Sequence, residues 1–168
     1  HVPVNKDNFH PNLTAIEAAI TSKTKMLVIN SPNNPTGAVY TPAEIEGLLE
    51  IANKHDLWLV SDEIYARLNW TGWPHISPAS LPGVSDRVIV ITGWSKSLAM
   101  TGWRIGLVSG PSQVMGAMGK LQANACSHIP SFLMDAALAA LTSEIDEAVE
   151  EFKQEYLLRR QIMMAGID

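Results

Sequence analysis

The sequence predicts an α/β fold built on a mostly parallel sheet with one antiparallel strand. The first observation is that short apolar runs alternate with amphipathic helical patterns between Leu13 and Ser109, which is typical of βαβ units. The second is that only eight positions separate Lys96, which follows the third apolar run, from Arg104, which begins the fourth. Because two parallel strands need a longer crossover, we expect the fourth strand, beginning near Arg104, to run antiparallel to its neighbour.

Four segments have the length and composition of strands. They are Met26–Ser31, Leu57–Asp62, Arg87–Thr92 and Arg104–Ser109. The first three are almost continuously apolar, which is typical of strands covered on both faces. The apolar stretch Val2–Val4 also has the character of a strand.

The segment Thr41–Lys54 carries the clearest helix signals. Thr41 can cap the helix, Pro42 occupies the first helical position, and Glu44 completes a capping box. Apolar residues recur along one side of the predicted helix at Ile45, Leu48, Leu49 and Ala52. We therefore expect this side to face the sheet.

Four further segments have helical patterns: Asn12–Thr21, Pro111–Ala125, Pro130–Thr142 and Ser143–Ala165. The segment Pro130–Thr142 is rich in Ala and Leu, so we expect it to be buried. The last segment begins with acidic residues and carries Arg159 and Arg160, which we place near its end, where they match the helix dipole. Between the second and third strands, residues 67–85 are rich in Trp, Pro and Gly, which indicates an irregular connection.

The composition excludes several classes of protein. The 168 residues include 12 basic and 17 acidic side chains, a formal net charge of −5, which argues against binding to nucleic acid or to an acidic membrane surface. The apolar runs have the length of strands, so we expect a soluble protein without a membrane span.

The single cysteine, Cys126, excludes an internal disulfide and is compatible with a reducing, cytoplasmic location. The five histidines lack metal-ligand spacing, so no metal site is expected.

Polar residues follow three successive strands and should meet at one edge of the sheet. Asn34 follows the first strand, Asp62 and Tyr65 follow the second, and Lys96 follows the third. In an open parallel sheet, ligands bind beyond the carboxyl ends of the strands. The antiparallel fourth strand returns Arg104 to the same edge.

These side chains suit the chemistry of pyridoxal phosphate. A lysine amine can form a Schiff base with an aldehyde, and a carboxylate beside a pyridine nitrogen keeps that nitrogen protonated. Phenol and amide donors stabilise the ring oxyanion, and the guanidinium of Arg104 fits a phosphate. Alone, each residue has a simpler interpretation: Asp62 as a helix cap, Asn34 as a turn former, Tyr65 as a core residue, and Lys96 and Arg104 as surface charges. Asp62 and Glu63 also resemble an ATPase magnesium site, but no phosphate-binding loop precedes them.

The ordered combination resembles the pyridoxal-phosphate-dependent class I and II aminotransferases of fold type I. The strings that carry the resemblance are SPNNPTG at 31–37, LVSDEIY at 59–65 and SKSLAMTGWRIG at 95–106. Within the predicted helices, the residues at 120–122 and at 159–160 are similar to those of the prokaryotic-type aspartate aminotransferase branch. The resemblance implies the large domain of that three-layer fold and the transfer of an amino group from an amino acid to a 2-oxo acid.

Carried over by position, the resemblance implies a role for each residue of the combination. Lys96 is the lysine that forms the Schiff base and later moves the proton, and Asp62 pairs with the pyridine nitrogen. Tyr65 and Asn34 bond the ring oxygen, and Arg104 binds the phosphate. Some family members have a phosphate-binding Ser where this chain has Gly93, and we expect Ser95 to supply a compensating hydroxyl.

Members of this family are more than twice as long as this chain, so we expect a central fragment that is inactive alone. Residues 1–143 should belong to the middle of the large domain, and residues 144–168 to the helix that leads to a small domain. The expected partners are amino acid and 2-oxo acid substrates and a second copy of the chain in a homodimer. Two alternatives stay open: a lyase or synthase on the same scaffold, and a non-catalytic piece that self-associates.

Overall fold

The computed structural model describes residues 2–84 and 86–167. The strands are β1 (Met26–Asn30), β2 (Trp58–Asp62), β3 (Val88–Gly93) and β4 (Gly106–Ser109), and the α-helices are α1 (Leu13–Ala18), α2 (Pro42–Lys54), α3 (Ser112–Ala125), α4 (Ser131–Ala139) and α5 (Asp146–Ile167). Short 3-10 helices lie at Pro78–Ser80, Thr101–Trp103 and Ser143–Ile145. Each strand begins and ends within two residues of its predicted bounds.

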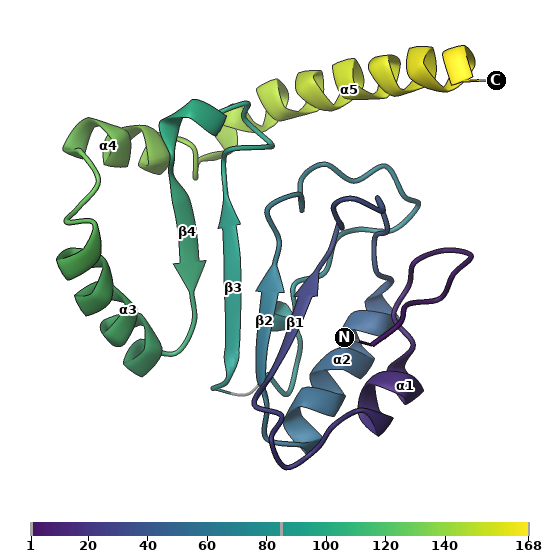
Figure 1. Ribbon diagram of the computed structural model, residues 1–168. Helices are drawn as coiled ribbons and strands as arrows, with labels where there is room; N and C mark the ends of the chain where they lie inside the picture. Colours follow the sequence, from purple (N-terminus) through teal and green to yellow (C-terminus); the bar gives the residue numbers. More distant parts are fainter. Residues whose placement is uncertain (1, 85, 168) are drawn as a thin grey trace.

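The four strands form one sheet in the order β1-β2-β3-β4 (Figure 1). The β1–β2 and β2–β3 pairs are parallel, and β3–β4 is antiparallel with Gly93 opposite Gly106. This confirms the predicted α/β sheet and the reversal that follows the short connection after Lys96. In Figure 1, β1, β2 and β3 all point toward the side of the molecule crossed by α5, and β4 points away from it.

Helix α2 covers one face of the sheet and provides four of the nine buried residues of the main core cluster. Its predicted capping box is confirmed: Glu44 N–H donates to Thr41 Oγ1 at 3.3 Å, and Thr41 N–H donates to Glu44 Oε2 at 2.7 Å. The apolar side of the helix joins Ile29, Leu59 and Val90 in one buried cluster. Leu48 is fully buried in this cluster.

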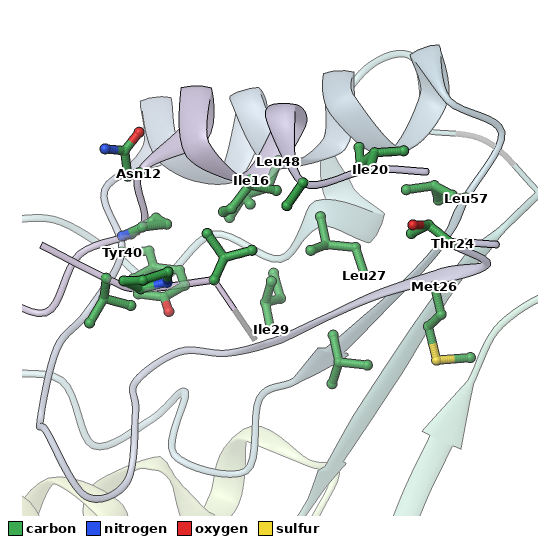
Figure 2. Close-up of a pocket in the computed structure, with 16 residues that line it drawn as sticks. Asn12, Ile16, Ile20, Thr24, Met26, Leu27, Ile29, Tyr40, Leu48 and Leu57 are labelled. Carbon is green, nitrogen blue, oxygen red and sulfur yellow. The ribbon is translucent and has the colours of Figure 1, made fainter. Parts of the chain in front are cut away.

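Helix α1 lies beside α2 and leaves an apolar hollow of about 580 Å³ along β1 (Figure 2). Ile16, Ile20, Leu27 and Leu48 line this hollow. The segment Val2–Val4 also lines it but forms no strand, contrary to the prediction. Pro3 has no N–H to donate to a strand ladder, which disfavours pairing at that position.

The opposite face of the sheet is partly exposed, so the expectation of strands covered on both faces is wrong at several positions. By register, Met26, Val28 and Ile91 all lie on the face away from α2. Their exposed fractions are 48%, 63% and 38%. Apolar composition predicts that a strand is suited to burial, but burial also needs a covering element, and among the described residues none covers Val28.

Helix α4 is more exposed than predicted. In α4, Leu133 and Ala137 pack against a small core of Trp94, Ile105 and Ala140, but Phe132, Met134, Leu138 and Leu141 are exposed. The burial expected for Pro130–Thr142 is therefore found only on the side of α4 that faces this small cluster.

Helix α5 continues through Gly166 to Ile167, and its last turn contains no basic residue. Arg159 and Arg160 therefore lie inside the helix rather than at its end, because glycine at this position does not terminate it. Among the helices of residues 2–84 and 86–167, none has the length and apolar character needed to cross a lipid bilayer.

Candidate active site

The predicted site residues follow the strand ends at one edge of the sheet. Segments 31–37, 62–65 and 93–96 come directly after or at the ends of β1, β2 and β3. The pairing of Gly93 with Gly106 brings the start of β4 to the same edge. Arg104, two positions before Gly106, therefore lies at the edge from which Asn34, Asp62 and Lys96 also arise.

Asn34 is held in a loop that the side chain of Asn30 organises. Asn30 Oδ1 accepts hydrogen bonds from Asn34 N at 3.1 Å and from Asn33 Nδ2 at 3.3 Å. Thr36 in turn donates its hydroxyl to Asn33 Oδ1 at 2.8 Å. These bonds fix the loop so that Asn34 Nδ2 donates to Tyr65 Oη at 3.1 Å, joining the loops after β1 and β2.

Asp62 and Tyr65 occupy a tight turn at the end of β2. Asp62 Oδ1 accepts from Ile64 N at 3.1 Å, and the carbonyl oxygen of Asp62 accepts from Asn30 Nδ2 at 3.1 Å. Tyr65 O accepts from Leu68 N at 2.8 Å. Asp62 lies on the sheet face away from α2 and is half-buried, so its carboxylate is held locally without being enclosed.

Lys96 lies near the same tyrosine. Its Nζ atom is 5.9 Å from the centre of the Tyr65 ring, within the range of a cation–π contact. The turn that carries Lys96 rests on Trp94, which is 8% exposed and donates its indole N–H to Ala140 O at 3.3 Å. The structure thus brings Asn34, Tyr65 and Lys96 together from three separate strand ends.

Gly93 is suited to the close approach of β4. A Cβ atom at this position would lie 3.2 Å from Gly106 Cα, 3.2 Å from Ile105 O and 3.3 Å from the Ile64 side chain. A larger residue would require the backbone of β4 to shift. Ser95, two positions later, is half-buried beside Lys96.

Arg104 has an unusual backbone conformation. Its φ of 57° and ψ of 41° lie in the left-handed region, which is uncommon for a residue with a side chain. The guanidinium Nη1 donates to Thr101 O at 3.0 Å in the preceding turn. Within the described ranges, no hydrogen bond or ion pair joins Arg104 to another predicted site residue, although the strand pairing places it at the same edge.

Sequence reasoning missed three residues next to the site. A hollow of about 570 Å³ beside Asn34 and Tyr65 is also lined by Trp70, Leu157 and Arg160. Arg160 reaches this position because α5 crosses the edge of the sheet (Figure 1), with Asp146 at its start paired to Arg67. No local motif marks these residues, because their approach depends on the path of α5 after a long intervening segment.

At the start of α2, the pKa values of Tyr40 and Glu44 are both shifted. Burial and the nearby carboxylate of Glu44 raise the pKa of Tyr40. Burial acts to raise the pKa of Glu44, but hydrogen bonds from Thr41 and His10 outweigh it, so the pKa of Glu44 is lowered. His10 Nδ1 lies 2.8 Å from Glu44 Oε2, which ties the segment before α1 to the first turn of α2.

Comparison with known proteins assigns a family. The family model "Aminotransferase class I and II" matches residues 1–168. An arginine–pyruvate transaminase of Pseudomonas aeruginosa is 40% identical over 97% of this chain, which covers 41% of that protein. An aspartate aminotransferase of Pyrococcus abyssi is 40% identical over 96% of this chain, which covers 42% of that protein.

Solved structures give the same result. A double mutant of the aspartate aminotransferase of Thermus thermophilus superposes with a TM-score of 0.90 at 39% identity, over 99% of this chain and 44% of that one. An aromatic aminotransferase from Pyrococcus horikoshii superposes with a TM-score of 0.90 at 39% identity, over 96% of this chain and 44% of that one. The chain spans about two fifths of the length of these relatives.

Proposed function

The chain belongs to the class I and II aminotransferases, and we propose that it supplies the cofactor-binding edge of an enzyme that transfers an amino group from an amino acid to a 2-oxo acid. The observation that carries the proposal is the grouping of Asn34, Tyr65 and Lys96, in which Asn34 Nδ2 lies 3.1 Å from Tyr65 Oη and Lys96 Nζ lies 5.9 Å from the Tyr65 ring centre. Three side chains of different chemistry, each from a different strand end, favour a specific ligand at this edge.

The donor set fits pyridoxal phosphate, the cofactor of this family. The ring nitrogen, ring oxygen, aldehyde and phosphate of the cofactor need a carboxylate, neutral donors, an amine and a cation, respectively. The edge offers Asp62, then Asn34 with Tyr65, then Lys96, and then Arg104. When bound, the cofactor supplies an electron sink for the bonds that break at the amino acid.

Lys96 and Asp62 carry the central roles in this proposal. The amine of Lys96 would hold the cofactor aldehyde covalently, and the same amine would be the base that moves a proton at the substrate carbon. The carboxylate of Asp62 holds a proton on the ring nitrogen by charge attraction. The hydrogen bonds to the turn at Asp62 keep this carboxylate in place.

The remaining residues of the site bind and orient the cofactor. Asn34 Nδ2 and the phenol of Tyr65 donate toward the ring oxygen, which favours its charged form. Arg104 binds the phosphate through its planar guanidinium, whose Nη1 donates to Thr101 O in this structure and whose other N–H groups can donate to phosphate oxygens. Ser95 adds a hydroxyl to the phosphate site.

The substrate class proposed is an amino acid with a 2-oxo acid. The relatives named above include an arginine, an aspartate and an aromatic aminotransferase at nearly equal identity, so no single amino acid is assigned. Residues 1–143 would form the middle of the large domain, and residues 144–168 the helix toward a small domain. A second copy of the chain is the proposed partner.

Borohydride trapping tests the proposal directly. The purified chain is mixed with pyridoxal phosphate, its absorption spectrum is recorded, borohydride is added, and the adduct is located by peptide mass. We expect one adduct, on Lys96, and none in Lys96→Ala. The matched control Lys120→Ala removes an exposed lysine on α3 and should keep the adduct. Labelling spread over the other lysines, or its persistence in Lys96→Ala, would contradict the proposal.

A further inference from the structure

Next to Asp62 lies a buried carboxylate that the proposed function does not use. Glu63 is only 6% exposed at the end of β2. Alternation along the strand places its side chain on the face opposite to that of Asp62. Burying a carboxylate is costly unless other groups satisfy it, so its partners indicate what it does.

Both partners come from the irregular connection between β2 and β3. Ser77 Oγ donates to Glu63 Oε1 at 2.7 Å. His75 Nε2 lies 3.1 Å from Glu63 Oε2, but without the alignment of a hydrogen bond, and among the described residues it has no other partner. The Glu63 carboxylate therefore fastens the end of β2 to a segment more than ten positions later in the chain.

The backbone of Glu63 is held as firmly as its side chain. Its N–H donates to Ile91 O of β3 at 2.7 Å, and its carbonyl accepts from Ala66 N at 2.9 Å. The second bond closes the turn that contains Tyr65. Glu63 thus lies between Asp62 and Tyr65 at a point bound to the connection, to β3 and to the turn.

We propose that Glu63 is a positioning residue whose buried carboxylate, held by Ser77 and His75, fixes the turn that presents Asp62 and Tyr65. The inference rests on the proposed function, because that function gives the reason why the turn must be held in place. The contacts of Glu63 themselves are observed in the structure. Glu63 touches no reacting atom. It acts by keeping its two neighbours in one arrangement.

Amide hydrogen exchange on the cofactor-free chain tests the proposal. In Glu63→Ala we expect the amides of Ala66 and Leu68 to exchange about tenfold faster, while peptides from β1 and α2 keep their rates. Glu63→Gln keeps an oxygen for Ser77 and should stay within about twofold of the unmutated chain. Glu46→Ala, which removes an exposed carboxylate from α2, is the matched control and should change neither region.

If Glu63→Ala does not fold, Ser77→Ala can be used instead, because it removes one hydrogen-bond partner of the Glu63 carboxylate. We expect the amides of Ala66 and Leu68 to exchange faster in this variant too, but by less than in Glu63→Ala. Unchanged exchange at Ala66 and Leu68 would overturn the proposal. Faster exchange throughout the chain would also overturn it, because it would show a general loss of stability. The adduct on Lys96 in the unmutated chain tests the proposed cofactor site separately. Failure of the cofactor site is therefore distinguishable from failure of the positioning role of Glu63.

A second readout uses the cofactor-loaded protein. Glu63→Ala should raise the pH midpoint of the cofactor's absorbance change in the same direction as Tyr65→Phe, by up to about one pH unit. If Glu63 acts through Tyr65, the double variant should shift no further than Tyr65→Phe alone. Full additivity of the two shifts would contradict a positioning role.

Discussion

The side-chain amide of Asn34 donates a 3.1 Å hydrogen bond to the phenol oxygen of Tyr65, which lies 31 positions later in the chain. Asn34 belongs to the loop after β1 and Tyr65 to the turn after β2. The bond therefore joins two adjacent strand ends at the edge where Lys96 also lies. Removing either partner changes the donors available to a ligand bound there.

Tyr65→Phe should raise the pH at which the bound cofactor loses its proton. The phenol stabilises the negatively charged ring oxygen and so favours the deprotonated form, and its loss should raise that midpoint by about one pH unit. An absorbance titration of the loaded protein measures the shift. Tyr156→Phe, on the exposed surface of α5, should leave the midpoint unchanged. An equal shift in both variants would contradict the role assigned to Tyr65.

Two substitutions at Arg104 should separate backbone strain from phosphate binding. Both Arg104→Gly and Arg104→Ala remove the guanidinium and its bond to Thr101 O. Only glycine adopts a φ of 57° without strain, so the Gly variant should be more stable than the Ala variant by about 1 kcal/mol. Denaturant unfolding measures this difference. Cofactor affinity should fall equally in both, and a fall in only one of them would contradict the assignment.

Glu44→Ala should destabilise the chain by about 1 kcal/mol at pH 7, because it removes the capping box of α2. The folded-state pKa of Glu44 lies below its ordinary value of 4.5. The stabilisation from the carboxylate is therefore present above about pH 4.5 and is lost as the pH falls through the lowered pKa. Urea unfolding from pH 7 to pH 3 should show this loss in the unmutated chain and in the control Glu46→Ala. If Glu44→Ala lost stability in parallel with the unmutated chain, the Glu44 carboxylate would not be the cause of the loss.

Leu48→Ala should lower the free energy of unfolding by about 2 to 5 kcal/mol, since Leu48 is fully buried between α2 and the sheet. The same change at Leu121, which is 69% exposed on α3, should cost less than about 0.5 kcal/mol. Chemical unfolding followed by circular dichroism measures both. Similar costs at the two positions would mean that the core does not lie where the structure places it.

The isolated chain should self-associate through the exposed side of α4. Met134 and Leu138 on α4 and Leu141 just after it recur at helical spacing with exposed fractions of 52%, 64% and 61%, and apolar surfaces of this kind favour association. Sedimentation velocity should show a mass that rises with concentration. Replacing Met134 and Leu138 by Ser should reduce this rise, whereas Phe9→Ser, on a distant loop, should not. A monomer at all concentrations would count against this surface.

Local signals predicted the sheet and the helix beside it. Thr41, Pro42 and Glu44 lie within one turn, and the reversal of β4 depends only on the short distance from Lys96 to Arg104. Such features depend on neighbours in sequence, so a single sequence contains them. The order of the polar residues along the chain likewise predicted that Asn34, Tyr65 and Lys96 would meet.

Features that depend on distant segments could not be predicted. Arg160 lines the same hollow as Asn34 only because α5 crosses the sheet edge, and the partners of Glu63 belong to an irregular segment without periodicity. The exposure of Leu138 has the same origin, because apolar composition does not specify whether another element covers it. The direction of the Arg104 side chain depends on a backbone angle that its neighbours in sequence do not determine.

The order of the strands has a consequence for how the chain is made. The sheet order β1-β2-β3-β4 is also the order of synthesis, so each strand that leaves the ribosome can pair with the strand completed just before it. Among these four strands, none has to insert between two that were made earlier. Asn34 and Tyr65 can already be in contact while the segment that contains Lys96 is still being translated.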